Sequence, residues 1–183
     1  MDDVNPDTLE RACEGSIDAF EEVYKATSSF VYNVALRITR NSVDAEEVTQ
    51  DVFMKIYHSL KDFHYRCTFK TWAYRITVNT AINHYRKSVR HQKNRQDFDS
   101  AIKTLPGGSS TAEVAIQSDN EARLNTLLGC LSLEHKTCII LREIEGLSYQ
   151  EIASIVKVPI NTVRSRLKRA RLALLEIAGK GLV

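Results

Sequence analysis

The chain has 183 residues with nearly balanced charge, 25 basic side chains against 23 acidic ones, and a hydrophobic fraction of 43%. This length allows one or two small domains. The sequence has no signal peptide and no apolar run long enough to span a bilayer. We therefore expect a cytoplasmic protein that does not insert into a membrane.

Charge is distributed unevenly along the chain. Residues 1–62 carry 13 acidic and 6 basic side chains, whereas residues 63–95 carry 8 basic side chains and no acidic one. Residues 96–146 are acidic again, and residues 147–183 carry 7 basic against 2 acidic side chains. Two basic blocks separated by an acidic one predict two separate contacts with nucleic acid. The acidic first block indicates a protein partner.

The first half is expected to be helical. Apolar residues recur at helical spacing over residues 16–39, which predicts one or two amphipathic helices that end at Asn41 and Ser42. Asp44 and Glu47 form a capping signal for the next helix. The apolar stripe of that helix consists of Ala45, Val48, Val52, Ile56 and Leu60.

A loop and a third helix follow. Residues 61–67 are predicted to be irregular, and Thr68 is placed to cap a helix that runs to about Lys87. Phe69, Trp72, Ala73 and Ile76 share one face of that helix.

The clearest interruption is Leu105-Pro-Gly-Gly-Ser-Ser110, within a stretch that has few large apolar side chains. We interpret it as a flexible linker. Two further helices are expected at Glu121–Cys130 and His135–Glu145. The predicted fold is therefore all-α: two small helical domains, residues 1–92 and 119–183, joined by a flexible linker over residues 93–118.

Residues 146–171 predict a helix-turn-helix. Gly146 can end the preceding helix in a left-handed conformation, and Ser148 opens a capping box with Glu151. Val158 and Pro159 end the short first helix, and Asn161 or Thr162 is expected to cap the second. Lys157 stands near the turn, where such units often carry glycine. The apolar residues of the second helix are Val163, Leu167, Ala170 and Leu174.

The other side of the second helix is densely basic, which suits arginine contacts to phosphates and guanine edges in a major groove. We predict that this helix binds DNA. Its candidate residues are Asn161, Thr162, Arg164, Ser165, Arg166, Lys168, Arg169 and Arg171.

The middle basic block interleaves cations with aromatic rings, a composition that suits unstacked or single-stranded DNA. Phe69 and Trp72 fall on the apolar face, so core packing and base stacking both stay open for them. We expect Tyr65, Tyr74 and Arg75 on the surface. The remaining candidates are Arg66, Lys70, Asn79, Asn83, Arg86, Lys87 and Arg90, of which the two asparagines either read a base edge or are ordinary exposed polar residues.

The four cysteines, Cys13, Cys67, Cys130 and Cys138, form no CxxC pair. His64 near Cys67 is the single hint of a ligand cluster, so buried or incidental thiols are expected, with no metal and no cofactor.

Four segments together resemble a known family. They are Asp44–Tyr57 (DAEEVTQDVFMKIY), Phe69–Ala81 (FKTWAYRITVNTA), Gly146–Ala153 (GLSYQEIA) and Thr162–Ala170 (TVRSRLKRA). In this order they resemble bacterial RNA polymerase sigma factors of the sigma-70 family. The compact length resembles the extracytoplasmic-function (ECF) group, which keeps only sigma domains two and four.

The resemblance implies a role in promoter-specific transcription initiation. It implies that domain two docks on core RNA polymerase and melts and reads the −10 promoter element, that domain four reads the −35 element, and that the linker threads near the polymerase active site. It also implies an anti-sigma protein as a partner, and no catalytic residues. The expected polymerase-binding residues are Asp44, Glu47, Gln50, Asp51, Met54 and Lys55.

Two other functions compete with this interpretation. A helix-turn-helix regulator that acts without polymerase docking accounts for the C-terminus, but not for a second basic, aromatic-rich block. An enzyme such as a DNA recombinase requires an α/β catalytic domain with a placed nucleophile, and the helical periodicity before residue 90 argues against one.

Overall fold

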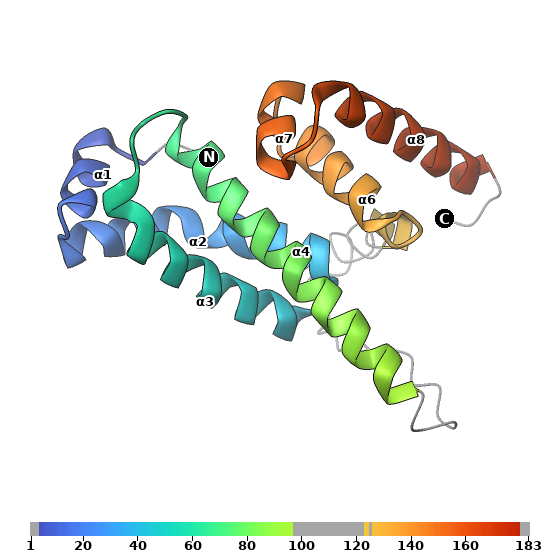
Figure 1. Ribbon diagram of the computed structural model, residues 1–183, viewed down its shortest axis with the longest axis horizontal. Helices are drawn as coiled ribbons and strands as arrows, with labels where there is room; N and C mark the ends of the chain where they lie inside the picture. Colours follow the sequence, from blue (N-terminus) through green and yellow to red (C-terminus); the bar gives the residue numbers. More distant parts are fainter. Residues whose placement is uncertain (1–3, 97–122, 125, 180–183) are drawn as a thin grey trace, which may run out of the picture.

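The computed structural model describes residues 4–96, 123–124 and 126–179, and these contain helices and no strand. The N-terminal group consists of α1 (Pro6–Cys13), α2 (Ile17–Thr39), α3 (Ser42–Ser59), the 3-10 turn η1 (Leu60–Asp62) and α4 (Phe69–Gln96). The C-terminal group contains α6 (Leu133–Ile139), η2 (Ile140–Ile144), α7 (Tyr149–Val156) and α8 (Ile160–Gly179). Figure 1 shows α4 on the side of the N-terminal group that faces the C-terminal group. The all-helical prediction is confirmed for the described residues.

The N-terminal group is a bundle in which α2, α3 and α4 pack against one another and α1 packs on α2. The stripe predicted for α3 is buried along its whole length, from Ala45 to Leu60. From α4, Ala73, Val78 and Ala81 enter the same core. Burial of these apolar faces provides the main stabilisation of the bundle.

The helix starts of this half differ from the prediction in two places. Asn41 caps α3, since its Oδ1 accepts a hydrogen bond from the N–H of Asp44 at 3.1 Å. The expected Asp44 and Glu47 capping signal is therefore wrong. The short helix α1 was not predicted, although Asn5 caps it and Pro6 occupies its first turn, which is a usual start signal.

Helix α4 begins as predicted and ends later. The Oγ1 of Thr68 accepts a hydrogen bond from the N–H of Thr71 at 3.1 Å. The helix continues beyond Lys87 to Gln96, because no proline or glycine interrupts residues 69–96. The first four residues of the expected linker are thus helical, and its remainder, residues 97–118, lies outside the described residues.

The C-terminal group contains the predicted helix-turn-helix. Gly146 adopts a left-handed φ of 71° after η2, which is a π-helical turn, and Ser148 and Glu151 form the expected capping box for α7. Lys157 holds the left-handed position of the turn with a φ of 54°. Neither Asn161 nor Thr162 caps α8, because that helix already begins at Ile160 and the N–H of Thr162 bonds to the carbonyl of Pro159.

A small core holds the helix-turn-helix together. Ile152 and Ile155 of α7 meet Val163, Leu167 and Ala170 of α8, and all five are buried. Helix α6 packs along α8 and completes this group. The recognition helix is thereby held by its apolar side, which leaves its basic side outward.

Replacement of Leu167 by alanine is expected to destabilise the C-terminal group by about 2–5 kcal/mol, since a fully buried leucine leaves a cavity. Leu175 on the same helix is 68% exposed whereas Leu167 is 0% exposed, so Leu175→Ala is the matched control and should be nearly neutral. Chemical unfolding followed by far-ultraviolet circular dichroism measures both variants. Equal losses of stability would contradict the packing described for α8.

Candidate nucleic-acid interface

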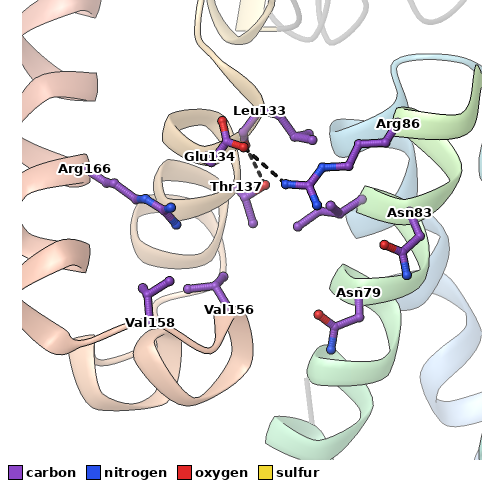
Figure 2. Close-up of a pocket in the computed structure, with 10 residues that line it drawn as sticks. Asn79, Asn83, Arg86, Leu133, Glu134, Thr137, Val156, Val158 and Arg166 are labelled. Atoms are coloured by element: carbon purple, nitrogen blue, oxygen red, sulfur yellow. Dashed lines mark hydrogen bonds and ion pairs between the residues drawn. The ribbon is translucent and has the colours of Figure 1, made fainter. Parts of the chain in front are cut away.

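The N-terminal group presents the outward side of α4 toward the C-terminal group. Asn79, Asn83 and Arg86 project from α4 into a cleft whose opposite wall is built from α6 and the turn after α7 (Figure 2). The cleft has a volume of about 250 Å³, and Arg166 of α8 lines its far side. Residues that the sequence assigns to two different DNA contacts thus line one cleft.

A cluster of aromatic rings lies near the start of α4. The ring of Trp72 is 5.2 Å from Phe63 and 5.8 Å from Phe69, measured between centroids. Phe69 is buried and Trp72 is partly buried, so Phe69 is a core residue and Trp72 keeps an accessible part.

A hollow of about 210 Å³ borders this cluster, and basic side chains surround its aromatic wall. An aromatic wall with cations beside it suits a base that has left its stack. Its lining residues are Asp62, Phe63, His64, Arg66, Cys67, Trp72 and Arg75. Tyr65 lies beside it, 57% exposed, with its ring 4.8 Å from Phe63.

The expected surface position of Tyr74 is wrong, because this tyrosine is only 1% exposed. Its ring packs 4.9 Å from Phe30 of α2, and its hydroxyl donates to Glu145 of the C-terminal group. Burial, followed by the hydrogen bond to Glu145, raises the pKa of Tyr74. Helical periodicity could not reveal this burial, since Phe30 of α2 and Glu145 of the C-terminal group are both distant from Tyr74 in sequence.

The recognition helix α8 exposes Arg164, Ser165, Lys168 and Arg169. Arg164 donates to the Oδ1 of Asn161 at 3.2 Å, one turn earlier, which orients its guanidinium at the start of the helix. Arg171 differs from these residues, because its Nε bonds to Glu143 at 3.1 Å and its Nη2 contacts the same carboxylate. Arg171 is therefore engaged within its own group.

The outer side of α3 holds the residues expected to bind polymerase. Gln50, Asp51 and Met54 are exposed, and Met54 is 60% exposed although it is apolar. Two neighbouring residues that were expected to be free of intramolecular contacts instead form hydrogen bonds to α4. Lys55 donates to the Oγ1 of Thr80 at 3.0 Å, and Glu47 bonds to His84 at 3.0 Å.

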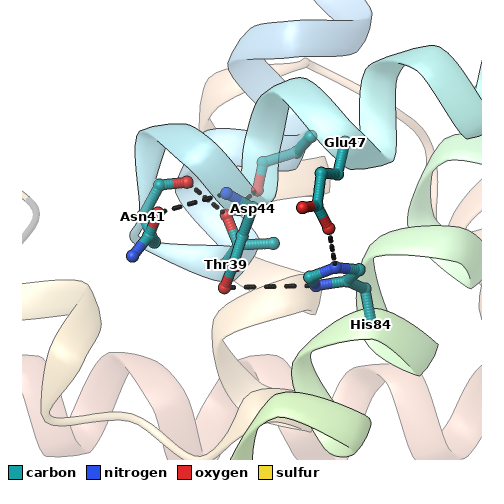
Figure 3. A network of polar contacts seen from close by, with 6 residues as sticks. Thr39, Asn41, Asp44, Glu47 and His84 are labelled. Carbon is teal, nitrogen blue, oxygen red and sulfur yellow. Dashed lines mark hydrogen bonds and ion pairs between the residues drawn. The ribbon is translucent and has the colours of Figure 1, made fainter.

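His84 links α4 to the start of α3. Figure 3 shows its ring between Glu47 and Asp44, with Nε2 3.0 Å from the Glu47 carboxylate and Nδ1 4.0 Å from that of Asp44. The hydrogen bond from His84 to Glu47 therefore links α3 to α4. Glu47 and Lys55 stay exposed, but each already contacts a residue of α4.

A buried lysine joins the two groups. Lys136 of α6 is 2% exposed, donates to the carbonyl of Ile38 in α2 at 3.1 Å, and lies over the Tyr85 ring of α4. Burial, helped by the like charge of Arg40, lowers the pKa of Lys136 to about 8. The sequence carries no sign of this burial.

Among the described residues no cluster of histidine, cysteine and acidic side chains could hold a metal ion. Across the same part of the chain, no helix is both long enough and apolar enough to cross a membrane.

Comparison with known proteins agrees with a two-part helical protein that carries a helix-turn-helix. The sigma-70 region 2 family model matches residues 23–91, and the sigma-70 region 4 model matches residues 121–174. The ECF RNA polymerase sigma-E factor of Haemophilus influenzae is 34% identical over 170 residues, which cover 89% of each chain. The RNA polymerase sigma-H factor of Pseudomonas aeruginosa is 31% identical over 91% of this chain and 89% of that protein.

Two solved structures share the fold. CnrH, in complex with the cytosolic domain of CnrY, has a TM-score of 0.72 at 22% identity over 97% of this chain and 99% of that chain. The sigma factor RpoE of Bartonella quintana, in complex with the anti-sigma factor NepR, has a TM-score of 0.68 at 24% identity over 89% and 98%. The chain belongs to the ECF RNA polymerase sigma factors of the sigma-70 family.

The low pKa of Lys136 predicts a specific pH dependence. Below about pH 8 the folded and unfolded chains both bind this proton, so folding bears the whole cost of burying the charge. From about pH 8 up to the ordinary lysine range only the unfolded chain keeps the proton, so the free energy of unfolding receives a contribution from Lys136 that rises with pH.

Lys136→Met removes this contribution while it keeps most of the side-chain volume. The difference between the thermal unfolding midpoints of the variant and the wild type, followed between pH 7 and about pH 10, should therefore shift in favour of the wild type as the pH rises. Parallel curves for the two proteins would show that Lys136 keeps an ordinary pKa.

Proposed function

We propose that the chain docks on core RNA polymerase and directs promoter-specific initiation, with residues 1–92 as sigma domain two, residues 93–118 as linker and residues 119–183 as sigma domain four. The protein acts in the cytoplasm, has no cofactor and catalyses no reaction itself. Nucleotide addition belongs to the polymerase. The RpoE structure solved with the anti-sigma factor NepR supports an anti-sigma protein as a further partner.

The observation that carries this proposal is the composition of α4. Its 28 residues include no acidic side chain, and the aromatic hollow lies beside its N-terminal end. Cations along a helix hold a backbone while rings receive bases. A second DNA contact, on the basic side of α8, belongs to a separate helical group. One chain thus has a surface for single-stranded DNA and another for double-stranded DNA of the same promoter.

Each surface has its proposed residues. For the −10 element they are Tyr65, Arg66, Lys70, Trp72, Tyr74, Arg75, Asn79, Asn83, Arg86, Lys87 and Arg90. For the −35 element they are Asn161, Thr162, Arg164, Ser165, Arg166, Lys168, Arg169 and Arg171. For polymerase they are Asp44, Glu47, Gln50, Asp51, Met54 and Lys55. Gln50, Asp51 and Met54 carry most of the proposal, because they are exposed whereas Glu47 and Lys55 each contact a residue of α4.

Reconstitution tests the proposal directly. The purified chain, added to core polymerase and a library of promoter fragments, should yield run-off transcripts of defined length that core polymerase alone does not produce. A regulator without polymerase docking is the second candidate, and it predicts tight duplex binding by the isolated chain and no co-purification with core polymerase. That pair of results would overturn the proposal.

The double variant Gln50→Ala with Asp51→Lys should abolish co-purification with core polymerase, because a reversed charge at an interface strands its partner at a cost of about 2–5 kcal/mol. Both side chains are exposed, so the thermal midpoint should barely move. The control is Asp18→Lys near the start of α2, an exposed acidic residue outside the proposed surface. Wild-type binding by the folded double variant would eliminate this surface as the docking site.

Arg164→Ala should weaken recognition of the −35 element by about 1–3 kcal/mol and relax specificity at one base pair. Arg171→Ala removes the same charge from the same helix, but its guanidinium is held by Glu143, so we expect a smaller and sequence-independent effect. Binding of the complex between the chain and core polymerase to promoters with single substitutions in the −35 element distinguishes the two. Identical losses for both variants would refute base readout by Arg164.

A further inference from the structure

The loop between η1 and α4 forms most of the aromatic hollow, and one residue of this loop is missing from the lining. Tyr65 stands in the middle of the loop but does not line the hollow. Its side chain is exposed outside the hollow, with its ring 4.8 Å from that of Phe63. The hollow is open because Tyr65 lies outside it. The residues around Tyr65 that do line it are Asp62, Phe63, His64, Arg66 and Cys67.

Tyr65 has an unusual backbone conformation at this position. Its φ of 55° is left-handed. Aromatic residues rarely adopt this conformation, and it persists only where surrounding contacts hold it. One such contact is the ring of Phe63, and the other is the thiol of Cys13 at the end of α1, whose Sγ lies 4.0 Å from the Tyr65 hydroxyl. The second contact ties α1 to the loop.

Helix α1 gives the Cys13 thiol a fixed position. Leu9 and Ala12 of this helix are buried. The Oγ1 of Thr8 donates to the carboxylate of Glu22 in α2 at 2.9 Å. Helix α1 also packs against η1, which directly precedes the loop. Since Cys13 is the last residue of a helix packed on both α2 and η1, it is a firm support for Tyr65.

The surroundings of Cys13 do not suit a direct contact with DNA. Burial raises the pKa of its thiol, and the nearby carboxylates of Glu10 and Glu14 add to this effect. The thiol is therefore neutral at physiological pH, and it contacts the Tyr65 hydroxyl without a charge. The two exposed carboxylates repel phosphate groups. An effect of Cys13 on DNA binding must therefore pass through Tyr65.

We propose that Cys13 is a positioning residue for the −10 contact, which holds Tyr65 outside the aromatic hollow and so keeps the hollow open for an unstacked base. The inference rests on the proposed function, since it takes the hollow as the base site. Without Cys13, Tyr65 returns to a less strained conformation and its ring enters the hollow. The ring competes with a base there, because walls that stack a base also stack a tyrosine. Helix α1 precedes residues 23–91, which the region 2 model matches, and it is thereby part of the DNA-reading unit.

Variants that remove only this contact test the proposal. Cys13→Ala removes the thiol, and Tyr65→Phe removes the hydroxyl but keeps the ring. Cys130→Ala is the matched control, because Cys130 lies in the C-terminal group, where its thiol donates to the carbonyl of Thr126. The three positions are exposed or partly buried, so the single variants and the double variant of Cys13 and Tyr65 should fold as the wild type does by circular dichroism.

The first measurement uses the free chain and its single tryptophan, Trp72, which is part of the wall of the hollow. Quenching of its fluorescence by acrylamide reports how open the hollow is. Cys13→Ala and Tyr65→Phe should each reduce quenching, since the ring at position 65 then covers the wall. The double variant should match either single variant, because both remove the same contact. Cys130→Ala should match the wild type.

The second measurement uses the complex with core polymerase and a labelled DNA fork, whose single-stranded part comes from a promoter found by run-off transcription. Cys13→Ala and Tyr65→Phe should each weaken fork binding by about two- to fivefold, since apparent affinity scales with the fraction of molecules in the binding-competent state. The double variant should lose no more than either single variant. A fork with abasic sites in the single strand should bind all variants equally, because it offers no base to the hollow.

Unchanged quenching in both variants would overturn the positioning of Tyr65 by Cys13. Reduced quenching with unchanged fork binding would overturn the role of this contact in the −10 interaction. Losses that multiply in the double variant would show that α1 supports the loop by another route, and they would overturn the role of Cys13. A wild-type chain that yields no run-off transcripts would instead contradict the proposed function, and quenching of Trp72 then judges the position of Tyr65 by itself.

Discussion

The structure depends on one constraint on α4, whose two sides have different partners. Its inner side supplies Ala73, Val78 and Ala81 to the core of the N-terminal bundle, so it cannot be released without loss of that core. Its outer side meets the C-terminal group, where Tyr74, Arg75 and Arg86 bind Glu145, Ser154 and Glu134. The arrangement of the two groups follows, because both sides of this one helix are in contact with the rest of the chain.

Much of the local architecture was predictable, because its causes lie within a few residues of one another. The stripe from Ala45 to Leu60 has the period of a helix, and a buried helix face is what that period predicts. Ser148 and Glu151 are three residues apart, the spacing that a capping box requires. Lys157 stands where helix-turn-helix units often carry glycine. The structure places this lysine in the left-handed conformation of the turn.

The errors have a different physical origin. Tyr74 was expected on the surface and is buried, Glu47 and Lys55 were expected to be free and are bonded to α4, and Lys136 is enclosed between α2 and α4. Each of these results from a contact between segments that are distant in sequence. Periodicity shows which side of a helix is apolar, but it does not show which second helix covers a polar side. The start of α3 was misjudged for a simpler reason, since Asn41 competes with Asp44 as a cap and precedes it.

The central claim is that α4 and α8 contact two different parts of one promoter. The direct measurement is a footprint of promoter DNA, with permanganate to detect unpaired thymines, for core polymerase that carries the wild-type chain, Trp72→Ala or Arg164→Ala. The account predicts that Arg164→Ala weakens protection of the −35 element, whereas Trp72→Ala, at a partly buried ring, keeps that protection and reduces the number of unpaired thymines near the −10 element. Equal effects of the two variants on both signals would contradict the account.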